Sequence, residues 1–254
     1  MPKHIKTAVG DGVAILTLAR EPLNVLNIAM MKEINGFLDS LKAEDGLKLL
    51  LIKAEGKAFS AGVDVAEHLG DQVEEMIEVF HGIFRRMDSL GVTSLAQVQG
   101  AALGGGCELA IYADLVVASE KAKFGQPEIL VGVLPPIAAL AMPRMMGRKR
   151  ALELILTGET IGALEAKELG LVNHVVPPEE LEAKTNELVG KIKGLSPIVL
   201  KYTRQAFLAG LMDDQAGGLD RIEEIYLGGL MKTHDAEEGL KAFLDKRRPE
   251  WKNK

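Results

Sequence analysis

The chain has 254 residues, 47% of them hydrophobic and 26% charged, which is enough to bury a sizeable core. The formal net charge is −6 and no basic run is longer than that of Lys246-Arg247-Arg248, so we expect no nucleic-acid partner. The single cysteine, Cys107, excludes an intramolecular disulfide and a cysteine-based zinc cluster, and its apolar surroundings are typical of a small buried residue. No apolar run approaches the roughly 18 residues that span a membrane, and the first residues lack a signal core, so we expect a soluble, cytoplasmic protein.

The first half of the chain alternates between strand and helix patterns. A hairpin is predicted from residues 5–9 and 13–18, joined by the Asp11-Gly12 turn. Further strands are expected at 47–52, 94–99 and 115–118, and apolar side chains at helical spacing predict helices over 27–43 and 71–90. This alternation is typical of βα units with a largely parallel sheet.

The second half reads differently. Short helices are expected near 137–146, 149–156 and 164–169, followed by a strand at 171–176. From Glu179 onward the pattern is almost entirely helical, with Pro197 opening one helix and Pro249 closing another. We place a soft boundary near Leu195, which gives a domain of residues 1–195 and a C-terminal helical region of residues 196–254. This region is too short and too amphipathic to stand alone, so we expect it to pack on a neighbour.

A glycine-rich stretch, Gly104-Gly105-Gly106, lies between a predicted strand and a predicted helix. Glycines at a helix start leave backbone N–H groups uncovered, and the positive end of the helix dipole favours a negative charge there. Glu108 follows Gly105 by three residues and shares its helical face. An oxyanion donor beside an ionisable group would form an active site. The alternative is a close helix–sheet packing site in which Glu108 only complements the dipole.

A second loop of small residues, Ser60-Ala61-Gly62, follows the preceding strand. In βα folds, ligands gather at the carboxyl ends of strands, so both loops are expected to face one crevice and to supply one oxyanion N–H each. Glu128 lies twenty residues after Glu108, and two carboxyls near such a site suit proton abstraction and donation beside a thioester carbonyl. Taken alone, Glu128 could equally be a solvated loop residue. Neither loop fits a dinucleotide fingerprint or a P-loop.

Several stretches, taken together and in order, resemble the crotonase (enoyl-CoA hydratase/isomerase) superfamily along essentially the whole chain. They are residues 56–64, 104–110, 124–128, 156–158, 166–172 and 238–247. The resemblance implies an α/β fold, a spiral of ββα units with a C-terminal helical trimerisation region. It also implies a homotrimer or a homohexamer built as a dimer of trimers.

The resemblance further implies the site. Ala61 and Gly105 would supply the two N–H groups of the oxyanion hole. The segment Ala61, Gly62, Val63 and Asp64, with Gly104 and Gly105, would bind the acyl-CoA substrate. Glu108 would position and deprotonate a water, and Glu128 would protonate the carbon that gains enolate character. No metal is implied, and no cofactor apart from the coenzyme A that the substrate carries.

Both glutamates together favour hydration, because isomerases and hydrolases of the family often keep only one. After Glu128 the chain departs from the usual glycine-rich turn, reading Val131-Gly132-Val133-Leu134-Pro135-Pro136. Residues 67–72 and 230–236 look like the subgroup of cyclohexa-1,5-diene-1-carbonyl-CoA hydratases of anaerobic benzoyl-CoA breakdown. We therefore expect a cyclic dienoyl-CoA hydratase. A straight-chain 2-enoyl-CoA hydratase, an isomerase or hydrolase on the same scaffold, and a catalytically silent oligomeric scaffold are the alternatives.

Overall fold

Six strands form the larger sheet of the protein, in the order β1-β2-β3-β4-β6-β9. The computed structural model describes residues 2–212 and 221–254. Only β1 and β2 pair antiparallel, and each later neighbour is parallel. The strands are β1 (Ile5–Gly10), β2 (Val13–Leu18), β3 (Leu49–Ala54), β4 (Thr93–Val98), β6 (Leu115–Ser119) and β9 (His174–Val176). The expected hairpin and largely parallel sheet are confirmed.

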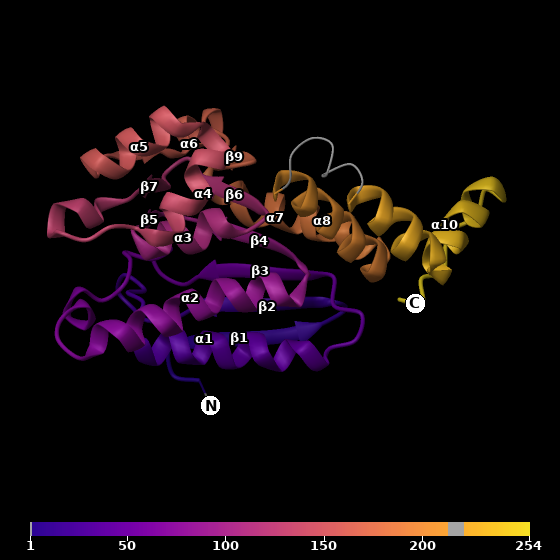
Figure 1. The fold of residues 1–254 in the computed structure, drawn as a ribbon, viewed down its shortest axis with the longest axis horizontal. Coiled ribbons are helices and arrows are strands. Elements are labelled where there is room, and N and C mark those ends of the chain that lie inside the picture. Colours follow the sequence, from indigo (N-terminus) through magenta and orange to yellow (C-terminus); the bar gives the residue numbers. More distant parts are fainter. Residues whose placement is uncertain (1, 213–220) are drawn as a thin grey trace.

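Two long helices cover one face of this sheet (Figure 1). They are α1 (Ile28–Ser40) and α2 (Gln72–Leu90), which pack against each other. The side chain of Asn27 caps α1 by accepting from the N–H of Met30 at 3.0 Å, and Gly91, at φ 62°, ends α2 in the left-handed conformation. Met30, Ile34 and Phe80 from these helices are buried in the main core. The helical spacing in the sequence thus located both helices to within a few residues.

A second sheet of three short strands, in the order β5-β7-β8, was not expected from the sequence. Its strands are β5 (Ala101–Leu103), β7 (Lys123–Gly125) and β8 (Thr160–Gly162). Three residues are too few to show an alternating pattern, so only tertiary pairing reveals them. β5 and β7 directly precede the helix with Glu108 and the turn with Glu128. The second sheet therefore brings these two stretches together.

Helices and single turns surround this smaller sheet. They are α3 (Gly105–Tyr112), α4 (Pro136–Met146), α5 (Arg148–Thr157) and α6 (Ala163–Glu168), with the 3-10 turn η3 (Pro127–Val131) after β7. Three further 3-10 turns lie elsewhere: η1 (Leu41–Ala43) follows α1, η2 (Val65–His68) precedes α2 and η4 (Pro178–Glu180) follows β9. The expected strand at 171–176 was too long, because only residues 174–176 pair with β6. Leu171 and Val172 are buried without being in a strand, so their apolar character reflects core packing.

The C-terminal part is helical, as expected, and α8 and α10 extend away from the body that carries the sheets (Figure 1). It comprises α7 (Leu181–Lys193), α8 (Pro197–Met212), η5 (Glu224–Gly229), η6 (Leu230–Lys232) and α10 (His234–Leu244). Pro197 opens α8 as predicted, whereas α10 ends at Leu244, before Pro249. The division into residues 1–195 and 196–254 stays a prediction.

A buried carboxylate ties the C-terminal tail to these helices. Asp235, at the start of α10, is 0% exposed and accepts from the Ser196 hydroxyl at 2.5 Å. It also accepts from the backbone N–H groups of Lys252 at 2.8 Å and Asn253 at 3.0 Å. Burial opposes ionisation, but these hydrogen bonds and that of His234 outweigh it and lower the pKa of Asp235. The tail is thereby fixed to the start of α8.

No helix among residues 2–212 and 221–254 combines the length and apolar composition needed to cross a membrane.

Candidate active site

The two loops of small residues meet in the structure. Ser60 bridges Ala102 of β5 in parallel, with the N–H of Leu103 donating to the Ser60 carbonyl at 2.9 Å. Beyond this bridge, a Cβ built on Gly62 would lie 3.7 Å from the nitrogen of Gly105. Gly62 itself has a φ of 103°, which favours glycine. The expectation that both loops face one crevice is therefore supported by direct contact between them.

Gly105, the first residue of α3, has no room for a side chain. A Cβ there would lie 2.6 Å from Cγ2 of Val63 and 3.0 Å from Cζ of Phe80. Real Cβ atoms do not approach other atoms so closely, so the residue type at this position is dictated by packing. The absence of a side chain also leaves the backbone N–H at the helix start uncovered.

The N–H groups of the first loop require a correction to the sequence prediction. The N–H of Ala61, predicted as an oxyanion donor, donates to the carbonyl of Leu23 at 2.9 Å. Leu26 and Val63 form a parallel bridge: the N–H of Leu26 donates to the carbonyl of Gly62, and the N–H of Asp64 donates to the carbonyl of Leu26. In such a bridge the N–H of Val63 itself points away from Leu26. Within residues 2–212 and 221–254, neither Val63 nor Gly105 has a hydrogen-bond acceptor for its N–H. Val63, not Ala61, therefore offers the free donor next to Gly105.

Glu108 is buried in the first turn of α3, with 1% of its surface exposed. Its carboxylate accepts from the N–H of Ala138 at 2.8 Å, in the first turn of α4. Burial raises the pKa of Glu108 to about 7. The charge of Glu128 adds to this rise, whereas the N–H groups of Ala138 and Ile137 oppose it. Sequence reasoning did not find this helix N-terminus as the partner of Glu108, because the residues are thirty positions apart.

Glu128 lies in η3, directly after β7, and is partly buried. Its Oε1 would be 2.7 Å from a Cβ on Gly104, so the carboxylate rests against the backbone of the glycine stretch. The backbone of Glu108 also contacts Gly104, since its N–H donates to the carbonyl of Gly104 at 2.9 Å. Burial raises the pKa of Glu128 to about 7 as well. The structure thus brings both predicted carboxyls to the glycine loop. Their raised pKa values mean that both take up a proton near neutral pH.

The other residues predicted to bind substrate lie on the same loops. Asp64 caps η2, accepting from the N–H of Ala66 at 3.1 Å, and lies 3.9 Å from the guanidinium of Arg20. Gly104 has a φ of 51°, which allows its N–H to donate to the carbonyl of Gly125 at 2.9 Å. Contact of these residues with coenzyme A stays a prediction.

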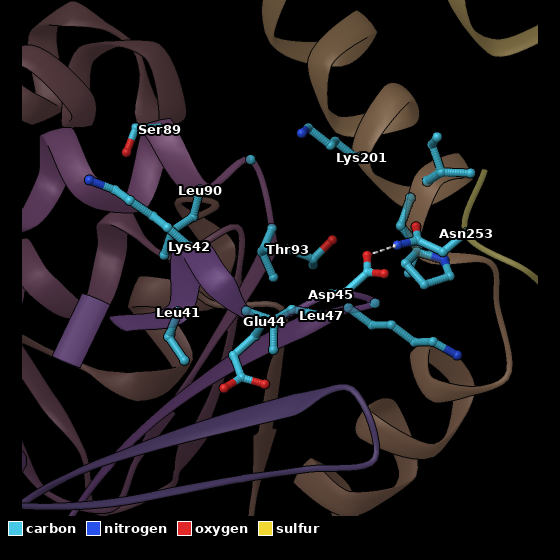
Figure 2. A pocket seen from close by; sticks show the side chains of 17 residues that line it. Leu41, Lys42, Glu44, Asp45, Leu47, Ser89, Leu90, Thr93, Lys201 and Asn253 are labelled. Carbon is cyan, nitrogen blue, oxygen red and sulfur yellow. Dashed lines mark hydrogen bonds between the residues drawn. The ribbon is translucent and has the colours of Figure 1, made fainter. Parts of the chain in front are cut away.

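A surface hollow of about 330 Å³ lies at the opposite edge of the sheet, where β3 and β4 begin (Figure 2). Figure 2 shows Asn253 reaching across it to Asp45, with an Nδ2 to Oδ1 distance of 2.8 Å. Its charged lining is mixed: Lys42, Glu44, Asp45, Lys48 and Lys201. The candidate active site lies elsewhere, since Val63 follows β3, Gly105 and Glu108 follow β5, and Glu128 follows β7. The hollow and the candidate active site are therefore separate. Among the described residues, no group of three or more His, Cys, Asp and Glu side chains could hold a metal ion.

A buried and a partly buried carboxyl beside two free N–H groups form a site for acid–base chemistry at a carbonyl. The sequence matches the model of the enoyl-CoA hydratase/isomerase family over residues 8–254. The chain belongs to this family, and it is an enzyme of the hydro-lyase type with the crotonase fold. The family resemblance drawn from the sequence is thereby confirmed.

Individual relatives cover almost the whole chain. One is a probable enoyl-CoA hydratase of Rhizobium meliloti (strain 1021), 37% identical over 245 residues, which are 95% of each chain. Another is the cyclohexa-1,5-dienecarbonyl-CoA hydratase of Thauera aromatica, 37% identical over 241 residues, or 94% of this chain and 92% of the relative. The crystal structure of the enoyl-CoA hydratase from Bacillus anthracis superimposes with a TM-score of 0.93 at 32% identity, covering 99% of this chain and 100% of that one.

Proposed function

We propose that the protein adds water across the conjugated double bond of an enoyl-CoA or dienoyl-CoA thioester. The observation that carries this proposal is the pair Glu108 and Glu128 beside the free N–H groups of Val63 and Gly105. The thioester oxygen accepts from these two N–H groups. As negative charge develops on that oxygen, fixed donors in a water-poor site stabilise it, and removing one such donor typically costs 10²–10³-fold in rate.

The two carboxyls then divide the proton transfers. Ionised Glu108, stabilised by the N–H of Ala138, removes a proton from water as the water oxygen bonds to the β-carbon. The electron pair of the double bond moves toward the thioester carbonyl and forms an enolate. Protonated Glu128 donates its proton to the α-carbon, which collapses the enolate. One water is consumed, and one proton each is gained by Glu108 and lost by Glu128, so a proton shift between them restores the starting state.

For the acyl group we propose cyclohexa-1,5-diene-1-carbonyl-CoA, with a straight-chain 2-enoyl-CoA as the second candidate. The similarity to the Thauera aromatica enzyme supports the cyclic diene, and the equal identity to the Rhizobium meliloti protein supports the second candidate. The segment after Glu128 departs from the usual glycine-rich turn, which weighs against a straight short-chain acyl group. Pro135 and Pro136 set the start of α4, and Val131 and Leu134 are exposed beside it.

We further propose that the C-terminal helices join copies of this chain into a homotrimer or homohexamer. Large apolar side chains are exposed along them, and an exposed apolar patch of this kind typically marks an interface. They are Phe207, Leu211, Tyr226, Leu227, Leu240 and Leu244. Light scattering of the purified protein tests this directly, and Phe207→Glu should shift the mass toward the monomer. A monomeric mass for both the unaltered protein and the variant would contradict this assembly.

The activity is tested by following the loss of conjugated-thioester absorbance with crotonyl-CoA and with cyclohexa-1,5-diene-1-carbonyl-CoA. We expect faster turnover of the cyclic diene, and a loss of 10²–10⁴-fold in Glu108→Gln and in Glu128→Gln, the range typical of general acid–base catalysis. Faster turnover of crotonyl-CoA would transfer the proposal to a straight-chain substrate. Hydration of neither thioester by the folded protein would contradict a hydratase.

A further inference from the structure

Gln126 lies between Glu128 and Cys107 and has no role in the chemistry described above. It follows β7 directly, precedes Glu128 by two residues and is 0% exposed. A buried amide has one face that donates and one that accepts, and both need partners. Its neighbours are the carboxylate of Glu128 on one side and the thiol of Cys107 on the other.

These neighbours fix which way the amide points. With its nitrogen toward Glu128, the amide donates to Oε1 and Oε2, both at 3.2 Å. In the reverse orientation, the amide oxygen would face two carboxylate oxygens and the nitrogen would face donors only. Oxygen and nitrogen of an amide are told apart by such a network. The amide nitrogen therefore belongs on the side of Glu128.

Cys107 completes the network on the other side. Its side chain is buried in α3, and burial raises the pKa of the thiol far above neutrality, so it keeps its proton. The N–H of Gly125 contacts the sulfur, and the amide of Gln126 is within hydrogen-bond reach of it. A protonated thiol is a weak donor, and the amide oxygen is the acceptor that faces it. The resulting chain runs from the thiol through the amide to the carboxylate.

We propose that Gln126 is a positioning residue for Glu128, and that the thiol of Cys107 holds its amide in the donating orientation. The amide N–H groups then fix the carboxylate against Gly104 and favour its ionised form. Glu108 is the other carboxyl of the site, and its pKa is raised by burial and by the charge of Glu128, so the two groups repel each other when both are ionised. Gln126 thereby limits how far burial raises the pKa of Glu128, so that this carboxyl can both release and regain its proton in each turnover. The kinetic part of this inference rests on the proposed function.

The network can be tested without any activity. Since Cys107 is the single cysteine of the chain, infrared spectroscopy of the intact protein reports one S–H stretching band. We expect the frequency of a hydrogen-bonded thiol, and a shift to that of a free thiol in Gln126→Met, which removes the acceptor but keeps the side-chain length. A band of a free thiol in the unaltered protein would show that the amide nitrogen faces the sulfur, and it would overturn the proposal.

The effect on Glu128 is tested by the pH dependence of hydration, with folding checked by thermal unfolding. Gln126→Met removes a donor to a carboxylate, so the pH profile of kcat should move upward by roughly one unit. Cys107→Ala should move the pH profile in the same direction, but by less. Cys107→Ser keeps a donor and should restore the profile. In the Gln126→Met background, Cys107→Ala should have no further effect on the profile. A lower kcat with an unmoved profile would make Gln126 merely structural. If no thioester is hydrated, the proposed function fails while the S–H band still decides the network.

Discussion

The carboxylate of Glu108 accepts a hydrogen bond from the backbone N–H of Ala138 at 2.8 Å, although thirty residues separate them. This contact aims the N-terminus of α4 at the buried acid of α3. The helix dipole and the N–H group favour the ionised carboxylate, whereas burial favours the protonated one. The balance leaves the pKa of Glu108 at about 7, where the group can gain and lose a proton within one turnover.

The hydration rate should depend on pH in the form of a bell. The pKa values of Glu108 and Glu128 are both raised to about 7, and the reaction needs one carboxyl ionised and the other protonated. At pH 5 both are protonated and at pH 9 both are ionised, so the rate should fall on either side of neutrality. We would measure kcat from pH 5 to 9. A rate that stays flat over this range would contradict the pairing.

Glu108 should also make the protein less stable at alkaline pH. Its native pKa of about 7 lies above the ordinary value of 4.5, so the native state binds the proton more tightly than the unfolded state. Its contribution to stability is therefore fully present below about pH 4.5 and is lost as pH rises to 7. We expect Glu108→Gln to raise the free energy of unfolding by up to about 3 kcal/mol at pH 8 relative to the wild type. At pH 4 the two proteins should unfold alike. An equal difference at both pH values in denaturant titrations would contradict this origin.

Gly105→Ala should lower both stability and activity. The new methyl group would meet Cγ2 of Val63 at 2.6 Å and Cζ of Phe80 at 3.0 Å, so the start of α3 must shift together with its free N–H. A loss of roughly 10²-fold in kcat/KM is expected if the oxyanion contact is displaced. Adding Val63→Ala removes the closer of the two clashes and should recover part of the melting temperature.

A matched control for this variant lies in α1. A Cβ on Gly36 would have no atom within 4 Å, and the residue is helical, so Gly36→Ala should stabilise the protein by about 0.5–1 kcal/mol. Its kcat/KM should equal that of the wild type. Full activity in Gly105→Ala would show that the N–H of Gly105 is not needed where we place it.

Asp235→Asn should loosen the C-terminal tail. The amide keeps one acceptor but turns an NH2 group toward the donors from Ser196, Lys252 and Asn253, which leaves buried donors unpaired at a cost of about 1–3 kcal/mol each. We expect a lower melting temperature and faster proteolysis of the last ten residues. Because the pKa of Asp235 is lowered, its contribution is present above the ordinary value of 3.8 and is lost as pH falls below it, so the two proteins should converge in acid. Equal proteolysis of both proteins at pH 7 would contradict the role of Asp235.

Apolar periodicity located the long elements because each buries one continuous face. The spacing of Met30, Ile34 and Leu38 marks α1, and that of Met76, Phe80 and Phe84 marks α2. The same reasoning failed where no face repeats. The three-residue strands β5, β7 and β8 are stabilised by pairing with segments far away in the sequence, and the buried run at Leu171 and Val172 imitates a strand.

The sequence by itself determined the family and predicted the two acids and the glycine stretch as the site, because residue types in a fixed order carry that information. Only the tertiary structure decided which N–H groups are free. Ala61 and Val63 look alike in sequence, yet pairing with Leu23 occupies the first and the bridge to Leu26 turns the second outward. It also decided the partners of the acids, Ala138 for Glu108 and Gln126 for Glu128. Hydrogen bonds and burial depend on neighbours in space, and those neighbours set the pKa values on which the proposed chemistry rests.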